Sequence, residues 1–252
     1  MSVFSFLKII AKLNKYHHIL KYNENEEMNK RVAGFKVKMG FGLHQGWAIE
    51  GAIGSFFKID ASYLSPNVNM AARLEAATGQ FGTLILLSGD LHDILSKNFQ
   101  SICREIDTVT VKGSIKPMRL FTVSIQTHDM EPDQDPLYFR TIKEKKSIRD
   151  KMRKELLGKL NTEKISTWEE INSDRDFLEL RKLLNPEFES TFKLCYASYL
   201  KGDWSSAGPY AKKLIELCPD DGPSVSLNYT INIRFEGKCP DWWNGFRPLT
   251  SK

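Results

Sequence analysis

The chain has 252 residues, 41% of them hydrophobic, and a formal net charge of +5. This length and composition support one or two globular domains, and so mild a charge gives no reason to expect nucleic acid as a partner. The four cysteines are scattered without a C-x-x-C pair, which argues against a zinc site and a disulfide framework and favours reduced thiols. No apolar stretch reaches the ~20 residues of a membrane span. Lysines interrupt the apolar N-terminus, unlike a signal peptide, so we expect a cytoplasmic location.

The first third of the chain predicts a helix followed by strands. Apolar residues recur at helical spacing through residues 2–30, which predicts an amphipathic helix whose polar end, residues 23–29, becomes a loop. A core helix is the commoner use of this pattern, and a helix lying on a membrane is the alternative. Alternating polarity over residues 35–41 predicts a half-buried strand. Four glycines between residues 42 and 54 then predict two short strands with a tight reversal near residues 44–46.

A second helix is predicted to begin at Ser65 and Pro66, a capping residue followed by proline at the first helical position. Asn69 and Arg73 are four residues apart, so they project from one face of this helix. An amide and a guanidinium at a helix start suit a sugar hydroxyl and a phosphate. Further strands are predicted at residues 83–87, 106–111 and 120–125, with a helix at 88–95. The order indicates an α+β sandwich with helices against a largely antiparallel sheet.

The stretch from Gly42 to Glu75 resembles the second half of a class III adenylate/guanylate cyclase catalytic domain. The helix pattern V-N-x-A-x-R-(L/M)-E of that family is matched at its spacing, and the wording is especially similar to the large membrane-linked cyclases of protists. The similarity covers roughly residues 1–125. It implies a partial ferredoxin-like cyclase fold that makes a cyclic nucleotide and pyrophosphate from ATP or GTP, at a site formed with a second cyclase domain in a homo- or heterodimer.

The resemblance assigns roles to four residues. Asn69 would orient the ribose, and Arg73 would stabilise phosphate charge in the transition state. Asp60 would read the purine, and as a carboxylate it would favour adenine over guanine. Lys116 is favoured over Lys112 as the residue that reaches the polyphosphate. The alternatives are a surface ion pair of Arg73 with Glu75 or Asp60, a polar helix-start role for Asn69, and a solvent-facing hairpin acid at Asp60.

The family's two metal-binding aspartates are absent from the sequence. They should lie upstream of the first helix and hold Mg²⁺ or Mn²⁺, yet the first aspartate in the chain is Asp60. The chain therefore resembles a cyclase domain that lacks its N-terminal half. We expect a truncated gene model as the cause, with a genuinely degenerate protein as the alternative. Any membrane association would come from upstream segments of a longer protein.

Three regions follow from these patterns: a cyclase domain at 1–127, a charged linker with a helix at 128–186, and a helical tail at 187–252. Between residues 140 and 159, nine Lys or Arg stand against three Asp or Glu, a surplus of six. A solvated helix is the commoner meaning of such a run, and a lipid or acidic-partner surface is the alternative. The tail resembles a single tetratricopeptide-like helix pair with Gly202 at its turn and Pro219 as its stop.

Two functions are consistent with the sequence. The first is a nucleotidyl cyclase subunit that is inactive as this chain alone. The second is a non-catalytic cyclase-homology module that dimerises or recruits partners through its helical tail. No metal ligands are assigned to this chain, and the five histidines show no metal-ligand spacing.

Overall fold

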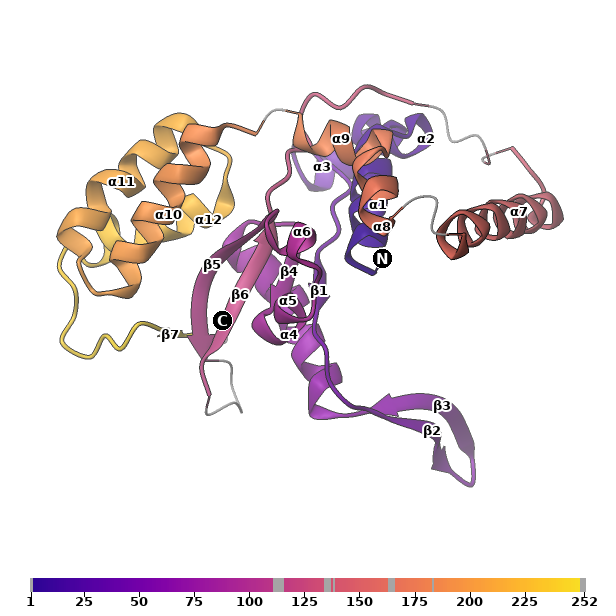
Figure 1. The fold of residues 1–252 in the computed structure, drawn as a ribbon, viewed down its shortest axis with the longest axis horizontal. Coiled ribbons are helices and arrows are strands. Elements are labelled where there is room, and N and C mark those ends of the chain that lie inside the picture. The colour runs from indigo at the N-terminus through magenta and orange to yellow at the C-terminus, as the bar shows by residue number, and fades with distance from the viewer. Residues whose placement is uncertain are drawn as a thin grey trace. The chain divides into compact units, whose positions relative to one another are not determined.

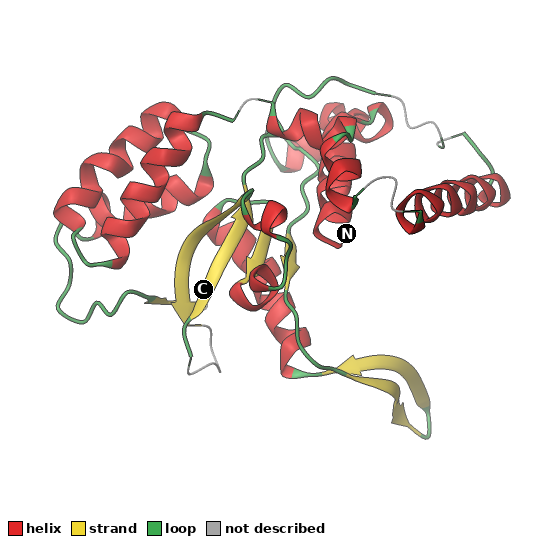
Figure 2. Cartoon of the chain, in the orientation of Figure 1, coloured by secondary structure: helices red, strands yellow, loops and turns green. Residues whose placement is uncertain are grey.

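The computed structural model describes residues 2–110, 116–133, 137, 139–162, 166–182 and 184–249, without the side chain of residue 160. The chain forms two compact units, each built from two separate stretches of sequence (Figures 1 and 2). Unit 1 comprises Met1–Met39 and Ile125–Leu183, and unit 2 comprises Gly40–Ser124 and Leu184–Lys252. The division into regions 1–127, 128–186 and 187–252 stays a prediction.

Unit 1 is helical. Its elements are α1 (Ser2–Lys15), α2 (His17–Leu20), the 3₁₀ turn η1 (Lys21–Glu24), α3 (Glu26–Arg31), α7 (Ile142–Asn161), α8 (Thr167–Asn172) and α9 (Arg175–Arg181). Helix α1 packs against α9, and the Phe4 and Phe177 rings meet edge to face with centroids 6.2 Å apart. The Lys15 side chain is 1% exposed, and its ammonium lies 2.8 Å from an Asp176 carboxylate oxygen and 3.1 Å from one of Glu179. Helices α1 and α9 therefore contact each other through ion pairs as well as through apolar side chains.

The predicted single helix over residues 2–30 is wrong in detail. Helix α1 ends at Lys15, because Tyr16 adopts an extended backbone and forms a parallel bridge with Asp133. The predicted loop at 23–29 is also wrong, since α3 begins at Glu26. Its cap is Asn25, whose side-chain oxygen accepts a hydrogen bond from the Met28 amide at 3.1 Å. A capping asparagine followed by two glutamates stabilises the start of this short helix.

Unit 2 contains a five-stranded mixed sheet in the order β1-β4-β6-β5-β7. The strands are β1 (Phe41–Leu43), β4 (Ile85–Ser88), β5 (Cys103–Thr110), β6 (Met118–Val123) and β7 (Arg247–Pro248). The pairs β4–β6 and β5–β6 are antiparallel, whereas β1–β4 and β5–β7 are parallel. The α+β prediction therefore agrees with a sheet and packed helices, but the sheet is mixed rather than largely antiparallel.

The remaining elements of unit 2 are one hairpin and seven helical segments. The hairpin consists of β2 (Ile49–Ser55) and β3 (Lys58–Leu64). The helices are α4 (Pro66–Phe81), α5 (Gly89–Asp93), α6 (Lys97–Gln100), α10 (Pro186–Leu200), α11 (Trp204–Leu217), α12 (Gly222–Asn228) and the π-helical η2 (Tyr229–Arg234). The predicted helix at 88–95 is confirmed as the shorter α5, which Ser88 caps by accepting from the Leu91 amide.

Two strand predictions are shifted. Residues 35–40 form no strand, and β1 begins only at Phe41, where the chain meets β4 as a pairing partner. The hairpin reverses at residues 56–57 instead of 44–46, because Ile49 to Ser55 pairs in register with Leu64 to Lys58. A segment of alternating polarity forms a strand only where a neighbouring strand provides the backbone hydrogen-bond partners.

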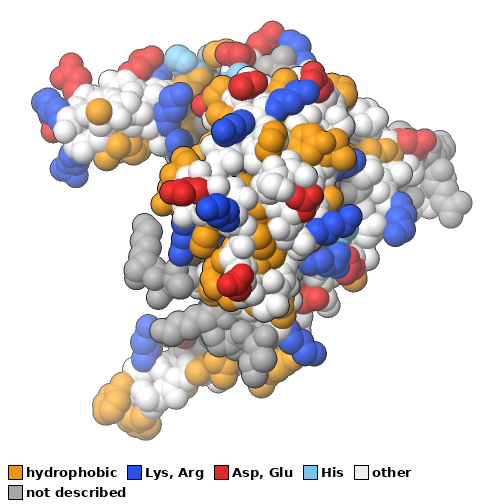
Figure 3. Space-filling view, turned by 90° about the vertical axis from the view of Figure 1, so that its left-hand side faces the viewer, with side chains coloured by type: hydrophobic (Ala, Val, Ile, Leu, Met, Phe, Trp, Pro, Cys, Tyr) orange, Lys and Arg blue, Asp and Glu red, His pale blue; other side chains and the backbone are white. Residues whose placement is uncertain are grey.

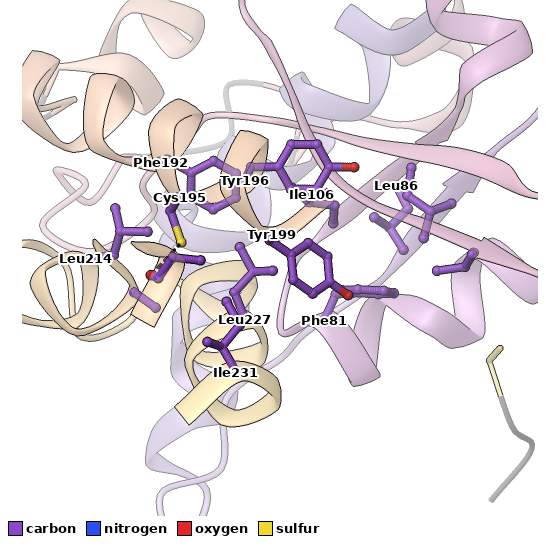
Figure 4. Close-up of a cluster of buried hydrophobic side chains, with 14 of the residues drawn as sticks. Phe81, Leu86, Ile106, Phe192, Cys195, Tyr196, Tyr199, Leu214, Leu227 and Ile231 are labelled. Atoms are coloured by element: carbon purple, nitrogen blue, oxygen red, sulfur yellow. Dashed lines mark hydrogen bonds between the residues drawn. The ribbon is translucent and has the colours of Figure 1, made fainter. Parts of the chain in front are cut away.

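One hydrophobic core joins the sheet to the C-terminal helices (Figure 4). In the close-up, side chains of α10, α11, α12 and η2 face those of α4, β4 and β5. The most enclosed large side chains here are Trp204, at 1% exposed, and Tyr199, at 0%. Residues 187–235 are mostly helical as predicted, whereas the rest of the tail contributes strand β7 to the sheet. Gly202 takes a left-handed backbone (φ 80°) at the turn between α10 and α11. The likeness to a tetratricopeptide repeat stays a prediction. The four cysteines are free, and burial raises the pKa of the Cys195 thiol to about 12.

Glycine at position 42 lets β1 approach α4 closely. A Cβ on Gly42 would lie against the backbone of Ala71, Leu74 and Glu75. We therefore expect Gly42→Ala to lower the free energy of unfolding by about 1–3 kcal/mol, the usual cost of overpacking. Gly79→Ala is the matched control, because a Cβ there meets nothing within 4 Å and alanine favours the helix by about 0.5–1 kcal/mol. Thermal melts of both variants check the prediction, and equal melting temperatures would contradict it.

Candidate functional site

The candidate site lies on the N-terminal half of α4. Ser65 caps this helix by accepting from the Asn67 amide at 3.0 Å, and Pro66 occupies its first turn, as the sequence predicts. The buried side of the helix carries Leu74, Ala77, Thr78 and Phe81. This packing leaves the opposite side of the helix facing outward.

Asn69 and Arg73 occupy that outward side. Both side chains are exposed, and one turn of helix, about 6 Å of axial rise, separates the two residues. Neither side chain makes a hydrogen bond or ion pair with another residue in the described part of the chain. The alternative ion pairs of Arg73 with Glu75 or Asp60 are therefore not formed there. An amide and a planar guanidinium with unused donors can bind a hydroxyl group and two oxygens of a phosphate.

A hydrogen-bond network fixes the start of α4 against the sheet. The His44 ring lies between Ser88 and Asn67, with 2.8 Å from Nδ1 to the Ser88 hydroxyl and 3.2 Å from Nε2 to Oδ1 of Asn67. The Trp47 carbonyl accepts from the Ser65 hydroxyl at 2.6 Å and from the Asn67 side-chain amide at 2.9 Å. The residue after β1, the end of β4 and the cap of α4 are thus tied together. Such support holds a helix-borne site in place.

These supporting residues were not predicted from the sequence. Asn67 lies two residues after the capping serine, and His44 follows β1 directly, yet only the folded chain brings them together. Gly46 makes room for this contact, because a Cβ there would overlap the Asn67 side chain. A polar residue just inside a Ser-Pro cap was the one available signal.

Asp60 is on the exposed hairpin and not beside Asn69 or Arg73. Its carboxylate pairs with Lys58 at 3.0 Å, and its side chain is 60% exposed. Five residues of extended chain, about 16 Å, separate it from Ser65 at the start of α4. Ser62, on the same face of β3, is half-buried and two residues nearer to α4. Side chains of α4 and side chains of β3 would contact one ligand only if the hairpin folded toward the helix, or if another chain bridged the distance between them.

Lys116 is exposed at the start of the segment that leads into β6. Residues 111–115, which include the alternative candidate Lys112 and the turn glycine Gly113, lie outside the described residues.

The carboxylates near the site do not form a metal centre. Among the described residues, no group of three or more His, Cys, Asp or Glu side chains is placed to hold a metal ion. The Asp60 carboxylate forms an ion pair with Lys58, and Glu75 is exposed on α4. The donor set described for this chain does not fit a pair of Mg²⁺ or Mn²⁺ ions.

A cavity of about 240 Å³ lies elsewhere in unit 2. Its wall consists of the end of α4, the start of α11, parts of α12 and the π-helix η2, and the C-terminal segment, and it includes Phe81, Trp204, Trp243 and Arg247. Neither Asn69 nor Arg73 lines it, so the candidate site is an open helix face and not this cavity.

The exposed face of α4 lies within a segment that is similar to a known protein family. Residues 7–126 match the adenylate and guanylate cyclase catalytic domain. This cyclase segment runs from α1 through β6 and contains Asn69, Arg73, Asp60 and Lys116. The earlier resemblance to cyclases is thereby confirmed for the domain, while the protist type stays a prediction.

One curated protein and two solved structures are similar to parts of this chain. A curated adenylate cyclase of Anabaena cylindrica is 30% identical over 105 residues, which cover 41% of this chain and 21% of that protein. The chain thus spans about a fifth of the length of that relative. Two solved structures of a bacterial light-regulated adenylyl cyclase are 28% and 30% identical. Each covers 33% of this chain, and 23% and 40% of its own chain, with TM-scores of 0.29 and 0.27.

Within the described ranges, none of the helices combines the length and the hydropathy needed to cross a bilayer.

Proposed function

We propose that the cyclase segment supplies one wall of a nucleotidyl cyclase active site, at which ATP or GTP is converted to a cyclic nucleotide and pyrophosphate. One observation carries the proposal: Asn69 and Arg73 stand one turn apart, exposed and without partners in the described chain, on a helix whose start is fixed to the sheet. This arrangement lies inside the segment that matches the cyclase domain.

The chemistry of the two side chains suits the roles proposed for them. Asn69 has an amide that can hold a ribose hydroxyl in position for attack on the α-phosphate. Arg73 has a charged fork that can follow the negative charge that develops on the phosphate oxygens during attack. Lys116 is proposed to contact the polyphosphate, and Asp60 or its strand neighbour Ser62 to contact the base. Mg²⁺ or Mn²⁺, if used, would be held by residues other than those described here.

A second cyclase domain is the partner that the proposal requires, and the hairpin is the surface that favours it. Most of its apolar side chains are exposed, and the extremes are Phe56 at 98% and Phe57 at 94%. Figure 3 shows hydrophobic side chains at the lower end of the view, where the hairpin lies. Exposed apolar clusters of this kind mark surfaces that bind other chains. A partner that covers the hairpin would also bring its own carboxylates toward α4, together with Asp60 of the hairpin.

Complementation tests the proposed function. The chain alone is expected to make no detectable cyclic nucleotide from ATP or GTP. Its described residues include no set of ligands for the metal ions that would stabilise the developing charge. Mixed with a cyclase domain that keeps its metal-binding aspartates but has lost its own Asn and Arg, the chain should restore activity.

Controls decide between catalysis and recruitment. The Asn69→Ala and Arg73→Ala chains should bind the partner equally well but restore little activity. Restoration by both variants at the wild-type level would overturn the proposal. It would favour the alternative, a non-catalytic cyclase-homology module that dimerises or recruits partners.

A further inference from the structure

Helix α7 holds the whole excess charge of the protein. It contains eight Lys or Arg and three Asp or Glu, so its net charge of +5 equals that of the full chain, whose other residues balance. The helix has 20 residues, and none of its described side chains is buried. The two ion pairs described at α7, Arg140 with Glu144 and Lys151 with Glu155, are local i,i+4 contacts. Because no described side chain of α7 is buried, its charge lies at the surface of the described chain.

The charge is unevenly placed around the helix. At 3.6 residues per turn, about half of the helix surface carries five basic residues and no acid. These residues are Lys145, Lys146, Arg149, Arg153 and Lys159. The other half carries three basic residues, Lys143, Lys151 and Lys154, which the three acids Glu144, Asp150 and Glu155 balance. All of the net positive charge thus faces one way.

Apolar side chains share that basic half. Ile148, Met152 and Leu156 follow one another at intervals of four residues, Ile142 lies between Arg149 and Arg153 around the helix, and Leu157 lies at the edge of this half. Ile142 is 87% exposed, Met152 61% and Leu157 45%, whereas Ile148 and Leu156 are half-buried. A helix whose only requirement is solubility would not need to place its apolar residues beside its uncompensated charge. It would also have no reason to carry all three acidic residues on the opposite half.

We propose that this face of α7 binds an anionic lipid surface, with the helix lying flat on the membrane. Basic side chains would reach the lipid headgroups on their long stems while Ile148, Met152 and Leu156 enter the boundary of the acyl chains. A negatively charged surface complements a face with five cations and no acid. A protein groove is less suited, because it takes up a separate apolar face, whereas the apolar residues of α7 alternate around the helix with the basic ones.

Vesicle binding by the full chain tests the proposal. The chain should sediment with vesicles that contain phosphatidylserine and not with pure phosphatidylcholine vesicles, and added salt should release it. Neutralising Lys146, Arg149 and Arg153 to glutamine should weaken partitioning about a hundredfold, because each basic residue at an anionic surface contributes about fivefold. The matched control neutralises Lys143, Lys151 and Lys154 to glutamine. It removes the same charge from the balanced half and should weaken binding several times less.

Two further measurements complete the test. Met152→Gln should weaken partitioning by about the same factor at low and at moderate salt, since screening does not act on the apolar contribution. Circular dichroism should show unchanged helix content in every variant, because glutamine and the basic residues have similar helix propensities. No binding to phosphatidylserine vesicles would overturn the proposal. Equal losses in the two triple variants would also overturn it, because binding would then depend on total charge and not on the face.

Discussion

Replacing Arg73 with alanine is expected to lower kcat by about 10²–10³, the usual loss when one preorganised charge-stabilising donor is removed. The measurement requires the chain in complex with a cyclase domain that supplies the metal-binding half. KM should change much less, because the contact strengthens only as negative charge develops on the phosphate. Lysine should be a poor substitute, since it lacks the planar fork that spans two oxygens.

Folding should be nearly unaffected by Arg73→Ala. The side chain is exposed and makes no ion pair with the described residues, so its removal exposes no buried partner. The matched control is Glu75→Gln, which changes a second exposed charge two residues along the same helix. It should leave kcat within about threefold, because surface substitutions away from the reaction have small effects. Steady-state kinetics and a thermal melt on each variant give the answer. An unchanged kcat together with a melting temperature lowered by many degrees would make Arg73 a structural residue.

Local signals in the sequence predicted the candidate helix. Ser65 and Pro66 start α4 where predicted, and the apolar positions Leu74 and Ala77 are buried, which leaves Asn69 and Arg73 exposed. Capping and helical periodicity act within a few residues, so a single chain reveals them. The relation of Asp60 to that helix was not predictable in the same way. The position of Asp60 depends on where the hairpin turns, because a two-residue shift of the turn moves the carboxylate along the strand by one pleat repeat.

Long-range pairing decided the elements that were misjudged. Residues 35–40 have the alternation of a strand, but the ladder begins at Phe41, where β4 is in reach. The long N-terminal helix stops at Lys15 because Tyr16 bridges Asp133, more than a hundred residues away. Neither partner can be read from the local pattern. The joining of the C-terminal helices to the sheet through one core was likewise open from the sequence, which allowed several surfaces for that helix pair.

Replacing Arg247 with methionine is expected to lower the free energy of unfolding of unit 2 by about 3–5 kcal/mol, the cost of leaving a buried charge without its partner. The partner is Asp107 on β5, whose side chain is 0% exposed. The Arg247 Nε donates to it, and the other guanidinium nitrogens donate to Thr230 at 3.0 Å and Ser226 at 2.9 Å. Without Arg247 the Asp107 carboxylate keeps the Thr108 amide at 2.8 Å and the Tyr199 hydroxyl at 3.5 Å.

Two variants separate the charge from the packing. Lys238→Met removes a positive charge from an exposed position in the same C-terminal segment and should change stability by less than about 0.5 kcal/mol. Adding Asp107→Asn to Arg247→Met removes the orphaned charge with little change of shape. The double variant should therefore be more stable than Arg247→Met alone. Chemical denaturation followed by tryptophan fluorescence measures all of these, because Trp204 and Trp243 lie in the affected core.

The pH dependence of the Arg247→Met deficit follows from the same pair. Burial raises the pKa of Asp107, and the charge of Arg247 opposes that rise. Without Arg247 the pKa of the folded state should rise further above the value of about 3.9 for an unfolded chain. The folded variant then takes up a proton that the unfolded chain does not, so its stability relative to wild type should improve as the pH falls through that raised pKa. The deficit should be largest at neutral pH and shrink in mild acid. A deficit that is independent of pH, and that Asp107→Asn does not relieve, would mean that Arg247 stabilises the segment through packing on Phe81 and not through its charge.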